Sequence, residues 1–262
     1  MKTAAAIFIA LFSVSAGAAD WVKQLSPPHP GSFPALRPMR ASYTFGWGVF
    51  TAATATAELA RTNELLRLDV KGGTVGVVRG LWCMDAASTA LWQPDTMRPV
   101  SHVVTEVFQK KTVKLRLDFD AKGVTQTRTT RSDETPVPKR LDFPNLLDMP
   151  TALMWLRSQP LRVGETYRCL TIPEASAYLT ELKIAGKEKL DVAGQSRDAI
   201  KVLLRAREVN NQLELVSSKR FKEAFAWFSD DGDRLLLRVM ASVFVGNVWM
   251  ELEKVEFRDG RG

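Results

Sequence analysis

Residues 113–120 read VKLRLDFD, and this stretch decides the fold class. The apolar residues Val113, Leu115, Leu117 and Phe119 alternate with Lys, Arg and Asp. Side chains along a strand point to opposite faces in turn, so this alternation is typical of an antiparallel strand with one face on a core and one in water. We therefore expect a mainly β protein.

The same period of two recurs along the chain. It is found at Tyr43, Phe45 and Trp47, and also at Leu66 to Val70, Leu182 to Ile184, Leu213 to Leu215 and Trp249 to Phe257. Turn residues separate these stretches at 121–123, 210–211 and 230–233. The pattern predicts a single large antiparallel curved sheet, or partly open barrel, of about ten to twelve strands.

Residues 147–158 break the alternation. Asp148 can cap a helix, Pro150 fits a first helical turn, and Met154 and Trp155 are among apolar residues at helical spacing. Pro160 ends the segment. We expect one helix at about 147–158, packed on the concave side of the sheet.

Three stretches of the chain carry a family resemblance. They are DMPTALMWLR at 148–157 followed by Pro160-Leu161 and Gly164, FAWFSDD at 225–231, and GNVWMEL at 246–252. The chain resembles the bacterial domain-of-unknown-function family 3108 over roughly residues 36–257, with an opening hairpin at 41–59. The resemblance implies an exported, mostly β protein without established activity. The run 51–57 and residues 72–92 depart from the family pattern.

At the level of the fold, that family looks like periplasmic lipoprotein carriers, in which a half-open barrel surrounds a helix and an apolar cavity. This second resemblance is an analogy between folds and implies function only indirectly.

The start of the chain predicts export. Lys2 precedes an apolar run from Ala4 to Gly17, and small residues follow at 16–18, which is typical of a cleaved signal peptide. The run is too short to span a membrane. We expect a signal peptide at 1–18, a Pro-rich segment at 19–35, one β-rich domain at 36–257 and a tail at 258–262. No Cys follows the cleavage site, so we expect a free periplasmic protein rather than a lipoprotein.

The charge of the chain favours no nucleic acid. The net charge is +7, and removal of Lys2 with the leader lowers it to +6. Basic residues alternate with acids, as at 187–191, instead of forming the stripe typical of nucleic-acid binding. The sequence therefore predicts no nucleic-acid partner and no membrane span, and it leaves the oligomeric state open.

Catalytic signals are weak throughout. His29 and His102 are the only histidines and neither lies in a motif, so a structural role is favoured for both. There is no nucleophile elbow, zinc motif or phosphate loop, and the acidic residues 230–233 fit a turn better than a calcium loop. We predict no catalytic residue, no cofactor and no metal site. A hydrolase therefore ranks third, after the two functions given below.

Two other features bear on binding. The residues Trp82, Met84, Trp92 and Met97, joined by Leu153 and Met154 of the helix, could line an apolar pocket, although core packing explains such residues as well. Cys83 and Cys169 are the only cysteines. They could form a disulfide in an oxidising compartment or remain as free core thiols.

Two functions of different classes follow. The first is a non-catalytic periplasmic binding or carrier module for an apolar small molecule or lipid. The second is an envelope protein that binds another protein or a glycan and has no ligand cavity.

Overall fold

The structure is a computed structural model that describes residues 21–33, 36–109, 111–130, 135–216, 223–243 and 246–258. The expected signal peptide at 1–18 and residues 259–262 of the expected tail lie outside these ranges. Most of the Pro-rich segment is described, and it begins with the 3-10 helix Val22–Gln24.

The described residues contain sixteen strands, all in one sheet. They are β1 (Met39–Trp47), β2 (Phe50–Thr62), β3 (Leu65–Thr74), β4 (Met84–Gln93), β5 (Arg98–Phe108), β6 (Lys111–Phe119), β7 (Val124–Thr129), β8 (Lys139–Leu141), β9 (Leu146–Asp148), β10 (Thr166–Ile172), β11 (Ala177–Val192), β12 (Gln195–Val209), β13 (Leu215–Val216), β14 (Ala224–Ser229), β15 (Leu236–Val243) and β16 (Gly246–Phe257).

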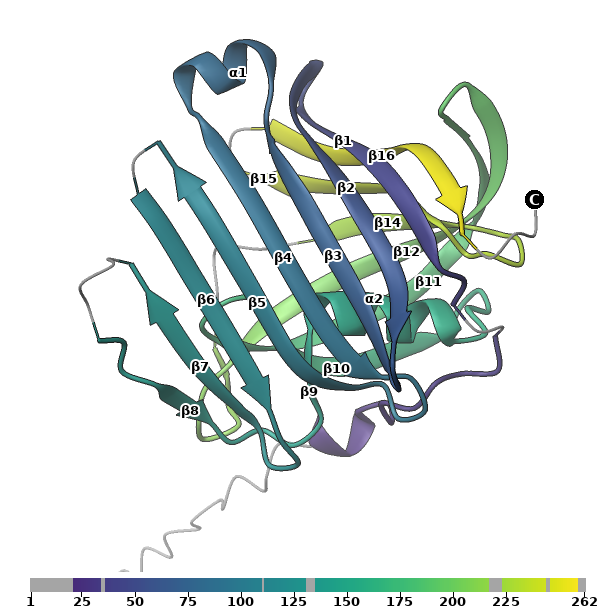
Figure 1. Cartoon of the computed structure of the whole chain (residues 1–262). Helices are drawn as coiled ribbons and strands as arrows, with labels where there is room; N and C mark the ends of the chain where they lie inside the picture. The colour runs from purple at the N-terminus through teal and green to yellow at the C-terminus, as the bar shows by residue number, and fades with distance from the viewer. Residues whose placement is uncertain are drawn as a thin grey trace, which may run out of the picture.

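The sheet is strongly curved and open (Figure 1). Its order is β8-β7-β6-β5-β4-β3-β2-β1-β16-β15-β14-β12-β11-β10-β9, with β13 paired to β12, so that β8 and β9 are the two free ends. The pairing of β1 with β16 joins the N-terminal strands to the C-terminal ones. The expectation of a large curved sheet is therefore confirmed.

Two details of the predicted sheet were wrong. The count of ten to twelve strands was too low, and the sheet is mixed, because β9 pairs with β10 in parallel. The alternation identified long strands with large apolar residues. It missed β8 and β9, which have only three residues each, and it gave no clear signal in β2 and β4, where Ala and Thr replace large side chains.

The predicted helix is confirmed as α2 (Met149–Ser158). Asp148 is its N-cap and accepts a hydrogen bond from the amide of Thr151 at 2.7 Å, and Pro150 lies in the first turn. Seven of its ten residues are buried. The helix lies inside the curve of the sheet, with its apolar residues in one cluster with those of β1 to β4 and β11 to β12 (Figure 1).

A second apolar cluster holds the two ends of the sheet together. It joins Leu117 of β6, Val124 of β7 and Leu141 of β8 to Leu170 and Ile172 of β10. Trp21 of the N-terminal segment is buried in the same cluster and donates a hydrogen bond to the carbonyl of Leu213. Packing rather than strand pairing thus brings the free ends of the sheet close.

A second helix, α1 (Gly76–Leu81), connects β3 to β4 at one end of the sheet. Gly76 opens it at φ +54°, a conformation that glycine adopts easily. Neither α1 nor α2 is long and apolar enough to cross a membrane, and the described chain has no other α-helix.

The packing of α2 can be tested with Trp155→Ala. Trp155 is fully buried and meets the ring of Tyr167 edge-on at 6.0 Å between centroids. Removing it should leave a cavity and lower the free energy of unfolding by about 3–5 kcal/mol in a denaturant titration. Phe50→Ala is the control, because Phe50 is 69% exposed and its loss should change stability by less than about 0.5 kcal/mol. Equal midpoints for Trp155→Ala and wild type would show that α2 is peripheral.

Candidate functional site

The concave face of the sheet carries an apolar hollow of about 270 Å³, which we call the recess. Its lining comes from five adjacent strands, β1 to β5. The lining residues are Phe45, Ala53, Thr54, Ala55, Val70, Gly72, Gly73, Thr74, Met84, Ala86, Ala87, Ser88 and Val104.

Strand register explains why a hollow forms there. Ala55 is paired with Gly72, and Gly72 with Ala86, so three small residues lie side by side on the concave face. Large side chains would fill this space, as Leu59 and Leu68 do further along the same strands. Gly72 admits no side chain at all, because a Cβ there would lie 2.5 Å from the carbonyl oxygen of Thr54.

Along the strands, the recess ends where the core around α2 begins. The row Ala57, Val70, Ser88 and Val104 crosses the sheet next to the small residues, and these side chains are only half-buried. The following row contains Leu59, Leu68, Ala90 and His102 and is buried. The interior is therefore packed at the helix and hollow beyond it.

Three polar residues, Ser88, His102 and Asp148, form a line at the floor of the recess. Ser88 lines it, and its Oγ is 3.1 Å from Nε2 of His102 on the neighbouring strand. On the other side of the imidazole ring, Nδ1 lies 4.0 Å from Oδ2 of Asp148, the cap of α2. Neither Nδ1 nor Oδ2 has a hydrogen-bond partner in the structure.

Burial shifts the pKa values of His102 and Asp148. Desolvation lowers the pKa of His102, opposed by the nearby carboxylate, and so favours a neutral ring at neutral pH. Desolvation also raises the pKa of Asp148, while the imidazole and the hydrogen bonds of Thr151 act in the opposite direction. Sequence reasoning took His102 as a structural residue and did not place Ser88 or Asp148 beside it. Only the strand register and the helix cap could have indicated this.

The residues proposed from sequence as a pocket lie in three places. Trp92, Met97, Leu153 and Met154 belong to the main core around α2, with Leu153 only partly buried. Met97 also borders a separate hollow of about 400 Å³, at the opposite ends of β2 and β3 from the recess.

Trp82 and Met84 lie at the other end of the sheet. Trp82 is 53% exposed and stacks on Phe108, with 6.0 Å between ring centroids. Of the six, Met84 alone lines the recess. The composition singled out large apolar residues, whereas the recess depends on small ones.

The two cysteines are free thiols in the structure. Cys83 is half-buried beside the start of β4, and Cys169 is buried in β10. Burial raises the pKa of the Cys169 thiol to about 12, so it is unreactive at neutral pH. The disulfide considered from the sequence is not formed.

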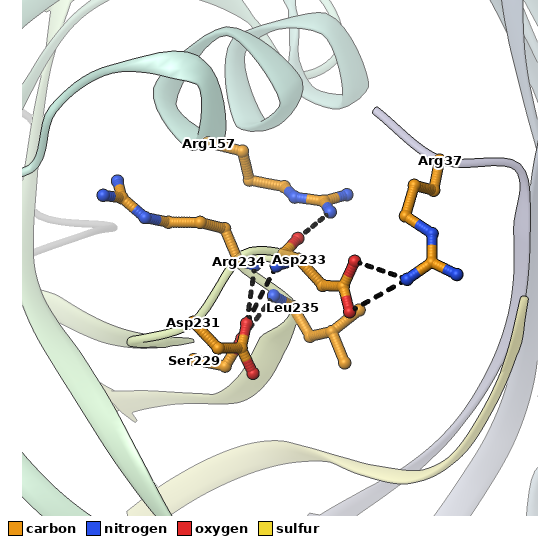
Figure 2. A network of polar contacts seen from close by, with 7 residues as sticks. All are labelled: Arg37, Arg157, Ser229, Asp231, Asp233, Arg234 and Leu235. Atoms are coloured by element: carbon orange, nitrogen blue, oxygen red, sulfur yellow. Dashed lines mark hydrogen bonds and ion pairs between the residues drawn. The ribbon is translucent and has the colours of Figure 1, made fainter. Parts of the chain in front are cut away.

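A second polar network surrounds the turn between β14 and β15 (Figure 2). One carboxylate oxygen of Asp231 accepts hydrogen bonds from the Ser229 hydroxyl and from the amides of Asp233 and Arg234. The Ser229 hydroxyl in turn accepts from the amide of Leu235. These contacts make 229–235 a structural turn, as the sequence indicated.

The same turn fixes the end of α2. Arg157 is buried and donates to the backbone carbonyl of Asp233 (Figure 2). Arg234 donates to the carbonyls of Gln159 and Pro160. Arg37 pairs with the carboxylate of Asp233 at 3.1 Å. Across the ranges that the structure describes, no group of His, Cys, Asp and Glu is arranged to hold a metal ion.

Comparison with known proteins adds the family and the fold. The model of the family "protein of unknown function (DUF3108)" matches residues 42–253. No curated protein sequence matches the chain. Among solved structures, a β-barrel-like protein of the domain of unknown function DUF1849 from Brucella abortus has a TM-score of 0.60 at 9% identity, covering 86% of this chain and all of its own.

Two further solved structures are less similar. A DUF1089 family protein from Pseudomonas aeruginosa has a TM-score of 0.35 at 12% identity, covering 73% of this chain and 90% of its own. The lipoprotein LppX from Mycobacterium tuberculosis has a TM-score of 0.26 at 13% identity, covering 83% and 85%. At 9% identity the Brucella protein shows a shared fold and nothing about function. The TM-scores of the other two are too low to show a shared fold.

Proposed function

The chain belongs to the DUF3108 family of proteins of unknown function, and we propose that it is an exported periplasmic protein that binds an apolar or lipid-like ligand in the recess. The observation that carries the proposal is a hollow open to solvent and lined mostly by carbon atoms, on the same face of the sheet as the packed core around α2. Leaving apolar surface exposed to water is unfavourable, and a bound alkyl chain would remove that surface from water.

The size of the recess limits the ligand. Its volume of about 270 Å³ is slightly below the range of about 300–1,000 Å³ found for sites of drug-sized molecules. We therefore expect a single alkyl or acyl chain, with the polar end of the ligand outside or at Ser88.

The end of the sheet nearest the recess offers a route for such a ligand. The β1–β2 turn, α1 and the start of β16 all lie at this end, as the strand register and Figure 1 indicate. Exposed apolar side chains gather there, and they are Trp47, Val49, Phe50, Val77, Leu81, Trp82, Val107 and Val248. A group of exposed apolar side chains at one end of the sheet is typical of contact with a membrane or another protein.

This patch also favours the second candidate function, an envelope protein that binds a partner. The two functions differ in what they require of the recess. A partner-binding protein without ligand would use the patch alone, and filling the recess would leave its partner binding unchanged.

Ligand binding can be tested with Ala86→Leu. The larger side chain should project into the recess and weaken binding of the apolar dye N-phenyl-1-naphthylamine at least tenfold in a fluorescence titration. Thr105→Leu is the control, because Thr105 lies on the neighbouring strand and faces the other side of the sheet. For wild type, straight-chain alcohols should displace the dye with affinities that rise about fourfold per methylene until the recess is full. Equal dye affinities for Ala86→Leu and wild type would contradict the proposal.

Export can be tested on the protein from its native cell. The mature chain should begin at Ala19 or Asp20 and be released with the periplasmic fraction without detergent. N-terminal sequencing decides the first point and fractionation the second. An intact Met1, or retention on membranes after a salt wash, would contradict the proposed location.

A further inference from the structure

The floor of the recess carries an arrangement that a simple binding site does not need. Ser88, His102 and Asp148 come from β4, β5 and the end of β9, and their side chains form a line from the recess into the core. Strand pairing sets His102 directly opposite Ala90, and Ser88 is two residues before Ala90 on the same face. A hydroxyl, an imidazole and a carboxylate in this order are the groups that activate a serine for nucleophilic attack.

The inner part of this line is costly for a packed core. Asp148 is fully buried, and its Oδ1 is used by the helix cap, whereas its Oδ2 has no hydrogen-bond partner and faces the ring of His102. A buried carboxylate oxygen and a buried ring nitrogen without partners are unusual, because each unsatisfied group costs stability. His102 Nδ1 and Asp148 Oδ2 are 4.0 Å apart. A small shift that brings them to hydrogen-bonding distance would give each atom a partner.

The tautomer of His102 fits the same role. If Nδ1 carries the ring proton and directs it at Asp148, then Nε2 is free to accept the hydrogen of the Ser88 hydroxyl, and this assignment follows from the hydrogen-bond network. The opposite tautomer would leave an imidazole acceptor facing a carboxylate. A neutral ring with a free Nε2 is a general base.

We propose that Ser88, His102 and Asp148 form an acyl-transfer site acting on an ester whose acyl chain lies in the recess. The idea rests on the proposed binding function, since the recess holds the chain that brings the ester to Ser88. Asp148 acts as a positioning residue for His102. Nδ1 and Oδ2 are 4.0 Å apart, which is longer than a hydrogen bond. Catalytic hydrogen bonds are often long in the absence of substrate and tighten when it binds.

The reaction proceeds in two balanced steps. The Ser88 oxygen bonds to the ester carbonyl carbon while its proton moves to His102 Nε2, and the bond from that carbon to the leaving alcohol breaks as the alcohol oxygen takes the proton from His102. The acyl group is then an ester of Ser88. A water molecule attacks this ester, gives one proton to His102 and releases the acid, and the proton returns to Ser88.

The surroundings of Ser88 determine how the reaction should be observed. The strand ladders to β3 and β5 occupy the backbone amides on both sides of Ser88, so stabilisation of a developing oxyanion is limited. We therefore expect slow turnover, and covalent labelling is a better readout than product release.

The test is labelling of the full-length protein with an alkyl fluorophosphonate that carries an octyl chain. Peptide mass spectrometry should find the adduct on Ser88, and Ser88→Ala should remain unlabelled. Ser101→Ala is the control, because Ser101 neighbours His102 but points to the other face, and it should label at the wild-type rate. His102→Gln should slow labelling at least a hundredfold.

The role of Asp148 is tested by Asp148→Asn. Asparagine caps helices about as well as aspartate, so the melting temperature and dye affinity should stay close to wild type while labelling slows at least tenfold. Asp148 is the charged group facing His102, whereas β4 and β6 contribute the uncharged Ser88, Ala90 and Leu117. Loss of its charge should move the pH of half-maximal labelling downward, because the carboxylate raises the pKa of His102. A merely structural role for Asp148 would leave that pH unchanged.

The outcomes separate this site from the binding function. Dye binding by a protein whose Ser88 is not labelled, or is labelled equally fast in His102→Gln, would overturn the acyl-transfer site and keep the binding function. Failure to bind the dye in any folded variant, wild type included, would overturn the binding function itself. The adduct on wild-type Ser88 is mapped directly, so the result does not depend on how any variant folds.

Discussion

The cap of α2 by Asp148 is the interaction on which the rest of the interior depends. The carboxylate ends β9, the last strand of one half of the sheet, starts the helix inside the curve, and faces His102 on β5 of the other half. Negative charge at a helix N-terminus is stabilised by the helix dipole, which offsets part of the cost of burying it. At the other end, Arg157 and Arg234 join the helix to the turn at 229–235. Fixed at both ends, α2 fills one part of the concave face and leaves the rest open.

The open part is set by residue size. Where Leu59 and Leu68 cross the sheet, they pack on the helix, and where Ala55, Gly72 and Ala86 cross the same strands there is no side chain to fill the space. Core positions in folded proteins are normally packed without hollows of this size, because empty apolar volume lowers stability. A row of small residues facing inward therefore makes sense if something else occupies the space.

The sequence predicted the class of fold, the family and α2, because those depend on local patterns such as the alternation in 113–120 and the cap at Asp148. It did not predict β2 and β4 clearly, since their Ala and Thr residues give no alternation of large and polar side chains. The same small residues line the recess. The feature that made these strands hard to recognise in the sequence is therefore also the feature that forms the site. Ser88 meets His102 because of the register between β4 and β5, and His102 meets Asp148 although β5 and β9 are far apart in the sequence. No pattern within one segment carries that information.

The most direct measurement of the central claim is a crystal structure of the protein with a fatty acid brominated at the end of its chain. We expect an anomalous bromine peak within the recess, in contact with Ala55, Gly72 and Ala86, and the carboxyl end of the ligand directed toward Ser88 or solvent. A recess that contains only ordered water, with bromine bound elsewhere or absent at saturating ligand, would contradict the account.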